Sequence, residues 1–246
     1  MGVKKDIKLI IDGKRIDGRD YLQLRNISMK VGVLEEADGS AYIEWGKNKI
    51  LAGVFGPKEA LPKHLADMHK ATLRCIYSMS TFASLEEHGR MGPNRRSIEI
   101  SKVIREALEN ITLTEKFPNT IIDVYIIVLQ AEGGTRVASL TAACLALMNA
   151  GIPVKMPLAA ISAGKVDGQL VLDLGKEEDN YGQADMPVGY TKNGDIVLLQ
   201  ADGLLKRDEI EKLLDYTWQG AQKLFEEQRK AIEEAYTKEM EKKLKL

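Results

Sequence analysis

The sequence contains few cysteines and few histidines, which limits the metal and nucleophile chemistry available to it. Among its 246 residues are two cysteines and three histidines. Cys75 and Cys144 lie inside apolar stretches at a spacing that fits no zinc or redox motif, so we expect two reduced core thiols. With only His64, His69 and His88, a histidine-rich metal site or a Ser-His-Asp triad has few candidates. Carboxylates must therefore carry any metal.

The chain also has no apolar segment long enough to cross a bilayer, and its first residues form no hydrophobic signal core. We therefore expect a cytoplasmic protein with no membrane role. The net charge of −1 argues against a uniformly basic nucleic-acid-binding surface but permits a local basic patch. Hydrophobic residues make up 44% and charged residues 29%, as in globular proteins, and the length suits one large or two small domains.

A glycine turn at residues 131–134 joins two apolar runs. Residues 121–129 are rich in β-branched and aromatic side chains, which predicts a strand, and residues 137–148 consist mainly of Ala, Leu, Cys and Met, which predicts a helix. Because this helix is apolar nearly all round, we expect it to lie buried between layers.

The start of this predicted helix is a candidate anion site made of Gly134, Thr135 and Arg136. The first N–H groups of a helix have no partner within the helix, and the positive end of its dipole favours an anion. The guanidinium of Arg136 can bind two phosphate oxygens at once. From this motif alone, an ordinary tight turn beside a solvated arginine remains the alternative.

The first half of the chain otherwise predicts a meander of strands followed by a helix. Alternating apolar residues and turn signals favour strands at residues 24–33, 41–45, 50–55 and 71–79. A helix is expected to begin near Asn94, because apolar residues then recur at helical spacing among charged ones.

The second half contains a segment similar to one in the first. Residues 166–176 match residues 37–47 as a turn, a strand with an acidic residue before its last apolar residue, and Gly-Lys. We interpret this as the same hairpin built twice, although a chance match is the alternative. The second copy is expected to continue into an acidic loop at residues 177–183. We therefore predict two units, residues 1–150 and 151–246.

After the acidic loop, residues 184–190 and 196–200 predict a hairpin, and from Arg207 the pattern is that of one long helix. Its end, rich in Glu and Lys, is most simply a solvated helix end or a frayed tail; a partner-binding helix is the alternative.

Asp179 and Asp185 are the candidate catalytic and metal-binding carboxylates. A carboxylate in a loop and another at the start of the following strand can converge on one divalent ion, or can act as acid and metal ligand. Asp185 is the single charge in an apolar strand segment, where burial requires a partner. For Asp179, an ordinary charged turn beside Glu177 and Glu178 is the alternative.

Arg95 and Arg96 are candidate RNA-binding residues at the start of the predicted helix. The helix dipole disfavours cations there, so an anion such as an RNA backbone phosphate would relieve the repulsion. The preceding residues 88–94 contain no acid and complete a basic patch. A solvated helix cap is the alternative. Lys63 and His64, on another loop, are weaker candidates for the same patch.

Several short motifs occur in the order and spacing of one family. They are Asp-Gly-Arg at 17–19, Gly-Pro-Lys-Glu at 56–59, Arg-Arg-Ser-Ile-Glu-Ile at 95–100, Gly-Thr-Arg at 134–136 and Ala-Asp-Met-Pro at 184–187. Over nearly the whole chain the sequence resembles the ribonuclease PH family, most of all the catalytic subunits of its ring-forming archaeal members. Gln23 departs from the family pattern, which usually has Glu there, so a structural ion pair is expected to be lost away from the site.

The resemblance implies an α+β, ribonuclease PH-like fold of two pseudo-symmetric sheet-plus-helix units packed as layers, with a long C-terminal helix. It also implies a phosphorolytic 3′ to 5′ exoribonuclease, in which inorganic phosphate is the co-substrate, nucleoside diphosphates are released, and the reverse reaction tails RNA. The implied roles are phosphate binding by Gly134, Thr135 and Arg136, proton donation by Asp179, Mg²⁺ or Mn²⁺ binding by Asp185 with Asp179, and RNA backbone binding by Arg95 and Arg96.

The resemblance further implies partners. Single-stranded RNA would thread through a hexameric ring, a trimer of dimers in which this chain alternates with a paralogous inactive subunit, and RNA-binding cap proteins would cover the ring. Two alternatives remain: a non-catalytic RNA-binding ring subunit, and a hydrolytic exoribonuclease that uses a metal-activated water.

Overall fold

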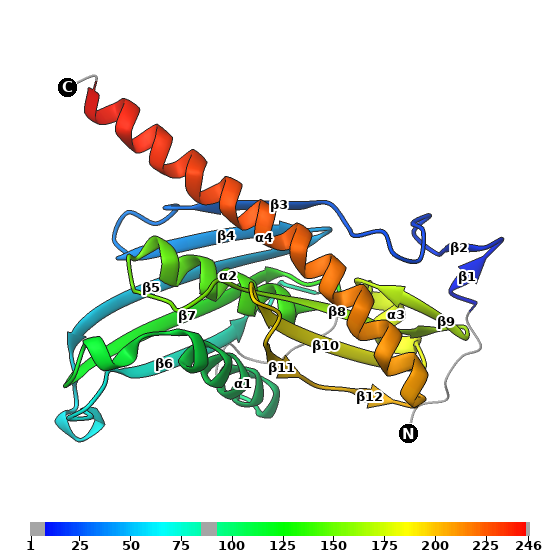
Figure 1. Cartoon of the computed structure of the whole chain (residues 1–246), viewed down its shortest axis with the longest axis horizontal. Coiled ribbons are helices and arrows are strands. Elements are labelled where there is room, and N and C mark those ends of the chain that lie inside the picture. Colours follow the sequence, from blue (N-terminus) through cyan, green and yellow to red (C-terminus); the bar gives the residue numbers. More distant parts are fainter. Residues whose placement is uncertain (1–7, 85–92, 245–246) are drawn as a thin grey trace.

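The computed structural model describes residues 8–84 and 93–244, and in this part of the chain two five-stranded sheets and four α-helices build an α+β fold (Figure 1). The first sheet has the order β3-β4-β5-β7-β6 and is antiparallel except for the parallel pair β6/β7. Its strands are β3 (Ile27–Val31), β4 (Gly39–Trp45), β5 (Asn48–Glu59), β6 (Thr72–Met79) and β7 (Thr120–Gln130).

The second sheet comes entirely from residues after position 150 and has the order β11-β10-β8-β9, with β12 also paired to β10. Its strands are β8 (Leu158–Val166), β9 (Gln169–Leu172), β10 (Ala184–Thr191), β11 (Ile196–Leu199) and β12 (Asp202–Gly203). A small hairpin of β1 (Ile10–Ile11) and β2 (Lys14–Arg15) precedes both sheets.

The helices are α1 (Arg95–Ile111), α2 (Thr135–Asn149), α3 (Lys176–Tyr181) and α4 (Arg207–Leu244), with short 3-10 turns η1 (Lys63–Leu65) and η2 (Thr114–Lys116). Helix α2 lies between the layers, against β4 and β5 of the first sheet and β8 of the second. Its alanines and leucines are buried on every side, which confirms the expected buried helix. A fully buried Leu contributes about 1.5–3 kcal/mol, so α2 is a major part of the core.

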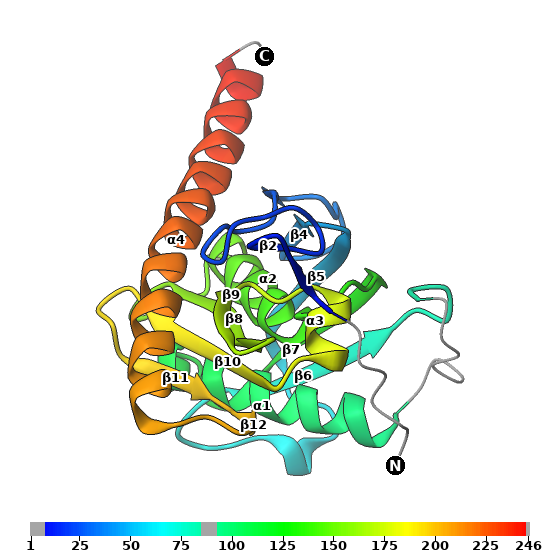
Figure 2. The same ribbon diagram turned by 90° about the vertical axis from the view of Figure 1, so that its right-hand side faces the viewer.

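Helix α4 packs on both sheets from outside: it contacts β8, β9 and β10 of the second sheet and β3 of the first. Leu213, Ala221 and Leu224 are completely buried along its contacting face. Figures 1 and 2 both show its C-terminal end projecting beyond the body of the molecule, so the predicted long helix is confirmed over Arg207–Leu244. Within the described residues, no helix combines the length and the apolar character required to span a membrane.

The repeated segment is confirmed only in part. The turns before β4 and β9 each join an antiparallel pair, β3/β4 and β8/β9. After β4, Gly46 and Lys47 form a tight turn into β5, which pairs with β4. Gly175 and Lys176 instead begin a helix, and the next strand, β10, pairs with β8. The hairpin is therefore not built twice, and residues 177–183, expected as a loop, largely form α3.

The segment before β3 lies against the second unit. Leu9 packs with Val166, Val171 and Leu174 in a small core separate from the main one. Its backbone N–H also donates to the carboxylate of Asp167 at 2.7 Å. These contacts bring the first residues of the described chain next to β9 and α3, where they take part in the polar network described below.

Candidate active site

The glycine turn leads into α2 with two consecutive residues in the left-handed region, Gly133 at φ +71° and Gly134 at φ +66°. Residues with a Cβ rarely adopt this conformation, which explains two glycines here. Gly134 is the N-cap of α2 and supplies no side-chain cap. No side chain of the cap residue occupies the first N–H groups of α2, so this helix start suits an anion.

A cavity of ≈330 Å³ opens beside this helix start and joins the two halves of the chain. The first half contributes the N-terminal ends of α1 and α2, and the second half contributes α3, β8, β10 and β12. Besides Gly134, the cavity is lined by the polar residues Arg96, Thr135, Arg136, Ser162, Asp179, Asn180, Asp185 and Asp202. The structure thus brings the predicted anion site, both predicted carboxylates and one of the two predicted RNA-binding arginines to one place.

Arg136 is held in this cavity by two partners. Its Nη1 donates to Gln200 Oε1 at 2.6 Å and its Nη2 donates to Glu99 Oε2 at 2.7 Å. Its Nε is buried without a hydrogen-bond partner, as is the hydroxyl of Ser162. Buried donors without partners are costly, and a phosphate oxygen would satisfy them. The arrangement therefore suits an anion beside the N-terminus of α2.

Asp185 lies at the start of β10 with its Oδ1 buried and without a hydrogen-bond partner. Burial, together with the nearby charges of Asp179 and Asp202, raises its pKa to about 7, although Arg136 opposes them. A carboxylate in such surroundings holds a proton or attracts a cation.

Asp179 lies on α3 and is exposed at the residue level, yet the protein atoms around its carboxyl desolvate it enough to raise its pKa. Arg96, Arg136 and a hydrogen bond from the backbone of Gly134 partly offset this effect. Its contact with Gly134 places the carboxyl at the glycine turn. One acidic group and the anion site therefore face each other across the boundary between the two units.

The side chains at this site could hold a divalent metal ion through only a few protein ligands. Among the residues that the structure describes, no group of three or more His, Cys, Asp or Glu is placed to hold a metal ion. Mg²⁺ commonly binds through one or two carboxylates, with water and substrate phosphates completing its shell. The unpartnered Oδ1 of Asp185 and the nearby carboxyl of Asp179 fit that pattern.

The other predicted RNA-binding residues lie outside the cavity lining. Arg95 is exposed at the first position of α1, which Asn94 caps by accepting from Ser97 N at 2.8 Å. Lys63 and His64 lie exposed in η1, beside the start of β6, whereas α1 begins near the end of β6. Residues 88–92 of the predicted basic loop lie outside the described residues.

A buried charge network that the sequence did not predict lies behind the glycine turn. Its members, contributed by the N-terminal segment and by the chain around β9 and α3, are Arg15, Arg19, Arg25, Asp173 and Glu178. Gln23, where we expected a lost ion pair, accepts from Arg19 Nη1 through its backbone carbonyl at 3.0 Å. Ser162, Asn180 and Asp202 also line the cavity, and nothing in their local sequence predicts this position.

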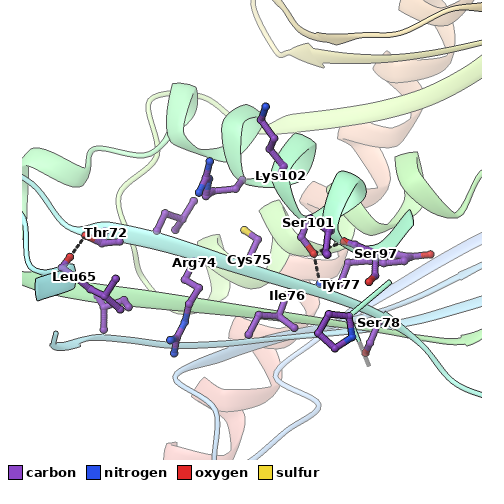
Figure 3. Close-up of a pocket in the computed structure, with 15 residues that line it drawn as sticks. Leu65, Thr72, Arg74, Cys75, Ile76, Tyr77, Ser78, Ser97, Ser101 and Lys102 are labelled. Atoms are coloured by element: carbon purple, nitrogen blue, oxygen red, sulfur yellow. Dashed lines mark hydrogen bonds between the residues drawn. The ribbon is translucent and has the colours of Figure 1, made fainter. Parts of the chain in front are cut away.

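A second, more apolar cavity of ≈610 Å³ lies between β6 and α1 (Figure 3). Figure 3 shows Cys75 and Tyr77 of β6 facing Ser97, Ser101 and Lys102 of α1, and the Ser101 hydroxyl accepts from Tyr77 N at 2.9 Å. None of the described residues that line this cavity carries a carboxylate. In the described part of the chain it therefore differs from the first cavity, which has acidic groups.

Comparison with known proteins agrees with the fold. Residues 23–153 match the 3′ exoribonuclease family, domain 1, and residues 156–219 match domain 2 of the same family, ribonuclease PH. The chain is 55% identical over 240 residues to the "Exosome complex component Rrp41" of Thermococcus onnurineus, which covers 97% of this chain and 96% of that protein. It is 50% identical over 237 residues to the protein of that name from Archaeoglobus fulgidus, covering 95% and 92%.

Solved structures agree. Rice (Oryza sativa) Rrp46 superposes with a TM-score of 0.78 at 25% identity, covering 87% of this chain and 98% of that chain. The Archaeoglobus fulgidus exosome with RNA bound to the active site gives a TM-score of 0.76 at 26% identity, covering 87% and 92%. The family resemblance and the ribonuclease PH-like fold expected from the sequence are confirmed. This chain belongs to the ribonuclease PH family of 3′ exoribonucleases.

Proposed function

We propose that this chain is the phosphorolytic subunit of an RNA-degrading ring, shortening RNA from its 3′ end and releasing nucleoside diphosphates. The main observation behind this proposal is the cavity, which brings the N-terminus of α2 and Arg136 together with Asp179 and Asp185. Inorganic phosphate would bind at Gly134, Thr135 and Arg136, where the unpartnered Nε of Arg136 offers a donor. The relatives named as exosome components, and the exosome solved with RNA, support the same assignment.

In the proposed reaction, an oxygen of inorganic phosphate attacks the phosphorus of the last phosphodiester. A new P–O–P bond forms, the bond from phosphorus to the preceding 3′ oxygen breaks, and that oxygen takes up a proton. The products are a nucleoside diphosphate and an RNA one nucleotide shorter. The protein's part is to position the phosphate in line with that bond and to stabilise the developing charge.

Asp179 supplies the proton in this proposal, because it lies next to the anion site and burial raises its pKa above that of a free carboxyl group. A Mg²⁺ or Mn²⁺ ion bound by Asp185 and Asp179 would neutralise negative charge on the reacting phosphates. Arg96, which lines the cavity, and Arg95, one residue before it, would hold the RNA backbone near its 3′ end.

The partner assignments belong to the same proposal. They are single-stranded RNA, a paralogous inactive subunit alternating with this chain in a hexameric ring, and RNA-binding cap proteins. Lys63 and His64, on an exposed turn away from the cavity, would contact RNA on its way to the site. The reverse reaction, tailing of RNA from nucleoside diphosphates, uses the same groups.

Product analysis tests the proposal against its two rivals. The assembled protein is incubated with an RNA that has a free 3′ end, with and without inorganic phosphate. Nucleoside diphosphates that form only with phosphate support phosphorolysis. Nucleoside monophosphates formed without phosphate would assign a hydrolytic exoribonuclease, and RNA binding without shortening would assign a non-catalytic ring subunit.

A further inference from the structure

Arg25 connects the two halves of the chain directly behind the active site. Its Nη2 donates to Asp173 Oδ1 at 2.6 Å, and its Nε lies 3.1 Å from both carboxylate oxygens. Its Nη1 donates to the backbone carbonyl of Glu132 at 2.7 Å, in the glycine turn. One buried guanidinium thus holds a carboxylate of the second unit and a peptide group of the first.

Asp173 provides a fixed anchor for this guanidinium. It is fully buried, and it also accepts from Arg25 N at 2.7 Å and from Trp45 Nε1 at 3.0 Å. Burial alone would raise its pKa, but the charge and hydrogen bonds of Arg25 outweigh it and hold the pKa of Asp173 below its usual value. Asp173 is therefore ionised and paired, and it gives Arg25 one defined orientation.

Asn48 fixes the other side of the glycine turn. Its Nδ2 donates to the carbonyl of Gly133 at 2.6 Å, and its Oδ1 accepts from Glu132 N at 2.5 Å. The peptide groups on both sides of Glu132 are thus held by side chains, Arg25 on one side and Asn48 on the other. The next residues along the chain are Gly134, Thr135 and Arg136 of the anion site.

The chain that follows Asp173 leads directly to Asp179. Helix α3 is anchored by Glu178, which is buried against Arg15 and accepts from Gly175 N at 2.8 Å. Arg15 also donates to the carbonyl of Asp173 at 2.8 Å. The position of Asp179 relative to Asp173 is therefore set by Glu178 and by Arg15 of the N-terminal segment, and Arg25 links Asp173 to the glycine turn.

We propose that Arg25 is a positioning residue for phosphate: by bridging Glu132 and Asp173 it holds the anion site at the N-terminus of α2 at a fixed place relative to Asp179. The proposal rests on the proposed phosphorolytic function. A lysine keeps the charge and can pair with Asp173, but a single ammonium lacks the planar fork that holds two partners in fixed directions.

The test compares Arg25→Lys with Arg74→Lys in the assembled protein. Arg74 makes a bidentate pair with Asp123, Nε to Oδ1 at 2.7 Å and Nη2 to Oδ2 at 2.8 Å, and does not line the active-site cavity. A small displacement of a bound reactant can lower the reaction rate up to about 100-fold. We therefore expect Arg25→Lys, which loosens the phosphate site, to raise the KM for phosphate by about tenfold or more. RNA affinity should change less than about twofold, because the proposed RNA contacts are on α1. Arg74→Lys should leave the KM for phosphate unchanged.

Unfolding temperature and ring assembly are measured for each variant, so that a loss of fold is recognised. If Arg25→Lys does not fold, Asp173→Asn, which keeps the shape of the anchor but removes its charge, carries the same expectation. A folded variant of either kind with an unaltered KM for phosphate overturns the positioning role, as does an equal rise in the KM for phosphate and for RNA. Failure of the proposed function is distinct, since the unmutated protein would then show no phosphate dependence at all.

Discussion

Gly133 and Gly175 meet backbone to backbone where the two units join. A Cβ built on Gly133 would lie 2.8 Å from the carbonyl carbon of Gly175 and 2.9 Å from the N of Lys176. No side chain fits in that space, so the glycine turn touches the start of α3 directly. This contact places the anion site of the first unit next to the carboxylate of Asp179 in the second.

Gly133→Ala should therefore reduce both stability and activity. The added methyl group meets rigid backbone, and overpacking of this kind costs about 1–3 kcal/mol in addition to the strain of a positive φ. Gly151→Ala is the matched control, because Gly151 has the same φ of +71° but open space around its Cβ position. Chemical unfolding and an RNA-shortening assay measure the two variants. Equal loss of stability in both would show that the Gly133 contact contributes nothing beyond backbone strain.

Asp179→Asn should abolish RNA shortening while leaving the assembled protein intact. The substitution removes the acidic proton with little change of shape. Glu177→Gln is the control, since Glu177 is an exposed carboxylate on the same helix that does not line the cavity. Rates are measured with saturating RNA and phosphate. Full activity in Asp179→Asn would remove Asp179 from the mechanism.

Replacing Arg95 and Arg96 together by Ala should weaken RNA binding and reduce its salt dependence. Each phosphate contact of a single strand contributes about −0.7 to the slope of log K against log salt, so the slope should become less negative by about 1.4 if both contact RNA. The pair Lys102→Ala and Arg105→Ala removes the same charge from the same helix outside the cavity. An unaltered slope in the first pair would assign Arg95 and Arg96 a structural role.

Asp185→Asn should stabilise the metal-free protein at neutral pH. The pKa of Asp185 is raised from 3.8 to about 7 in the folded state, so folding favours its protonated form. The stability of the unmutated protein therefore decreases as pH rises from about 4 to about 7, whereas Asn does not titrate. The advantage of the variant should grow across this window to about 2–4 kcal/mol, and an excess of Mg²⁺ should reduce it by stabilising ionised Asp185.

Chemical unfolding of both proteins at several pH values measures this advantage. A difference that stays constant from pH 4 to pH 8 would show that Asp185 is not desolvated as the structure indicates.

The sequence predicted the elements that have strong local signals. The strand before the glycine turn, the buried helix after it and the long helix from Arg207 each have clear periodicity, and the structure places them as β7, α2 and α4. Helix α3 was expected as a loop because its six residues, mostly acidic or polar, show no apolar periodicity. Its fold depends instead on Glu178, whose partner Arg15 lies 163 residues away in the sequence.

The sequence indicated the charged residues that line the candidate site, but not the buried residues that hold them in place. Asp185 and Arg136 stand out locally, as a charge in an apolar strand and a cation after a glycine turn. Arg25 and Asp173 do not, because the pair is separated by 148 residues and neither local pattern indicates burial. The acid in the repeated motif illustrates this: Glu44 is partly exposed, whereas Asp173 at the matching position is fully buried.

The fate of labelled inorganic phosphate tests the central claim most directly. The assembled protein is given RNA and phosphate that carries an isotopic label on its phosphorus, and the released nucleotides are separated. The account predicts that the label appears in the β-phosphate of nucleoside diphosphates, one label for each nucleotide removed. Unlabelled nucleoside monophosphates, formed at a rate that does not depend on phosphate, would contradict it.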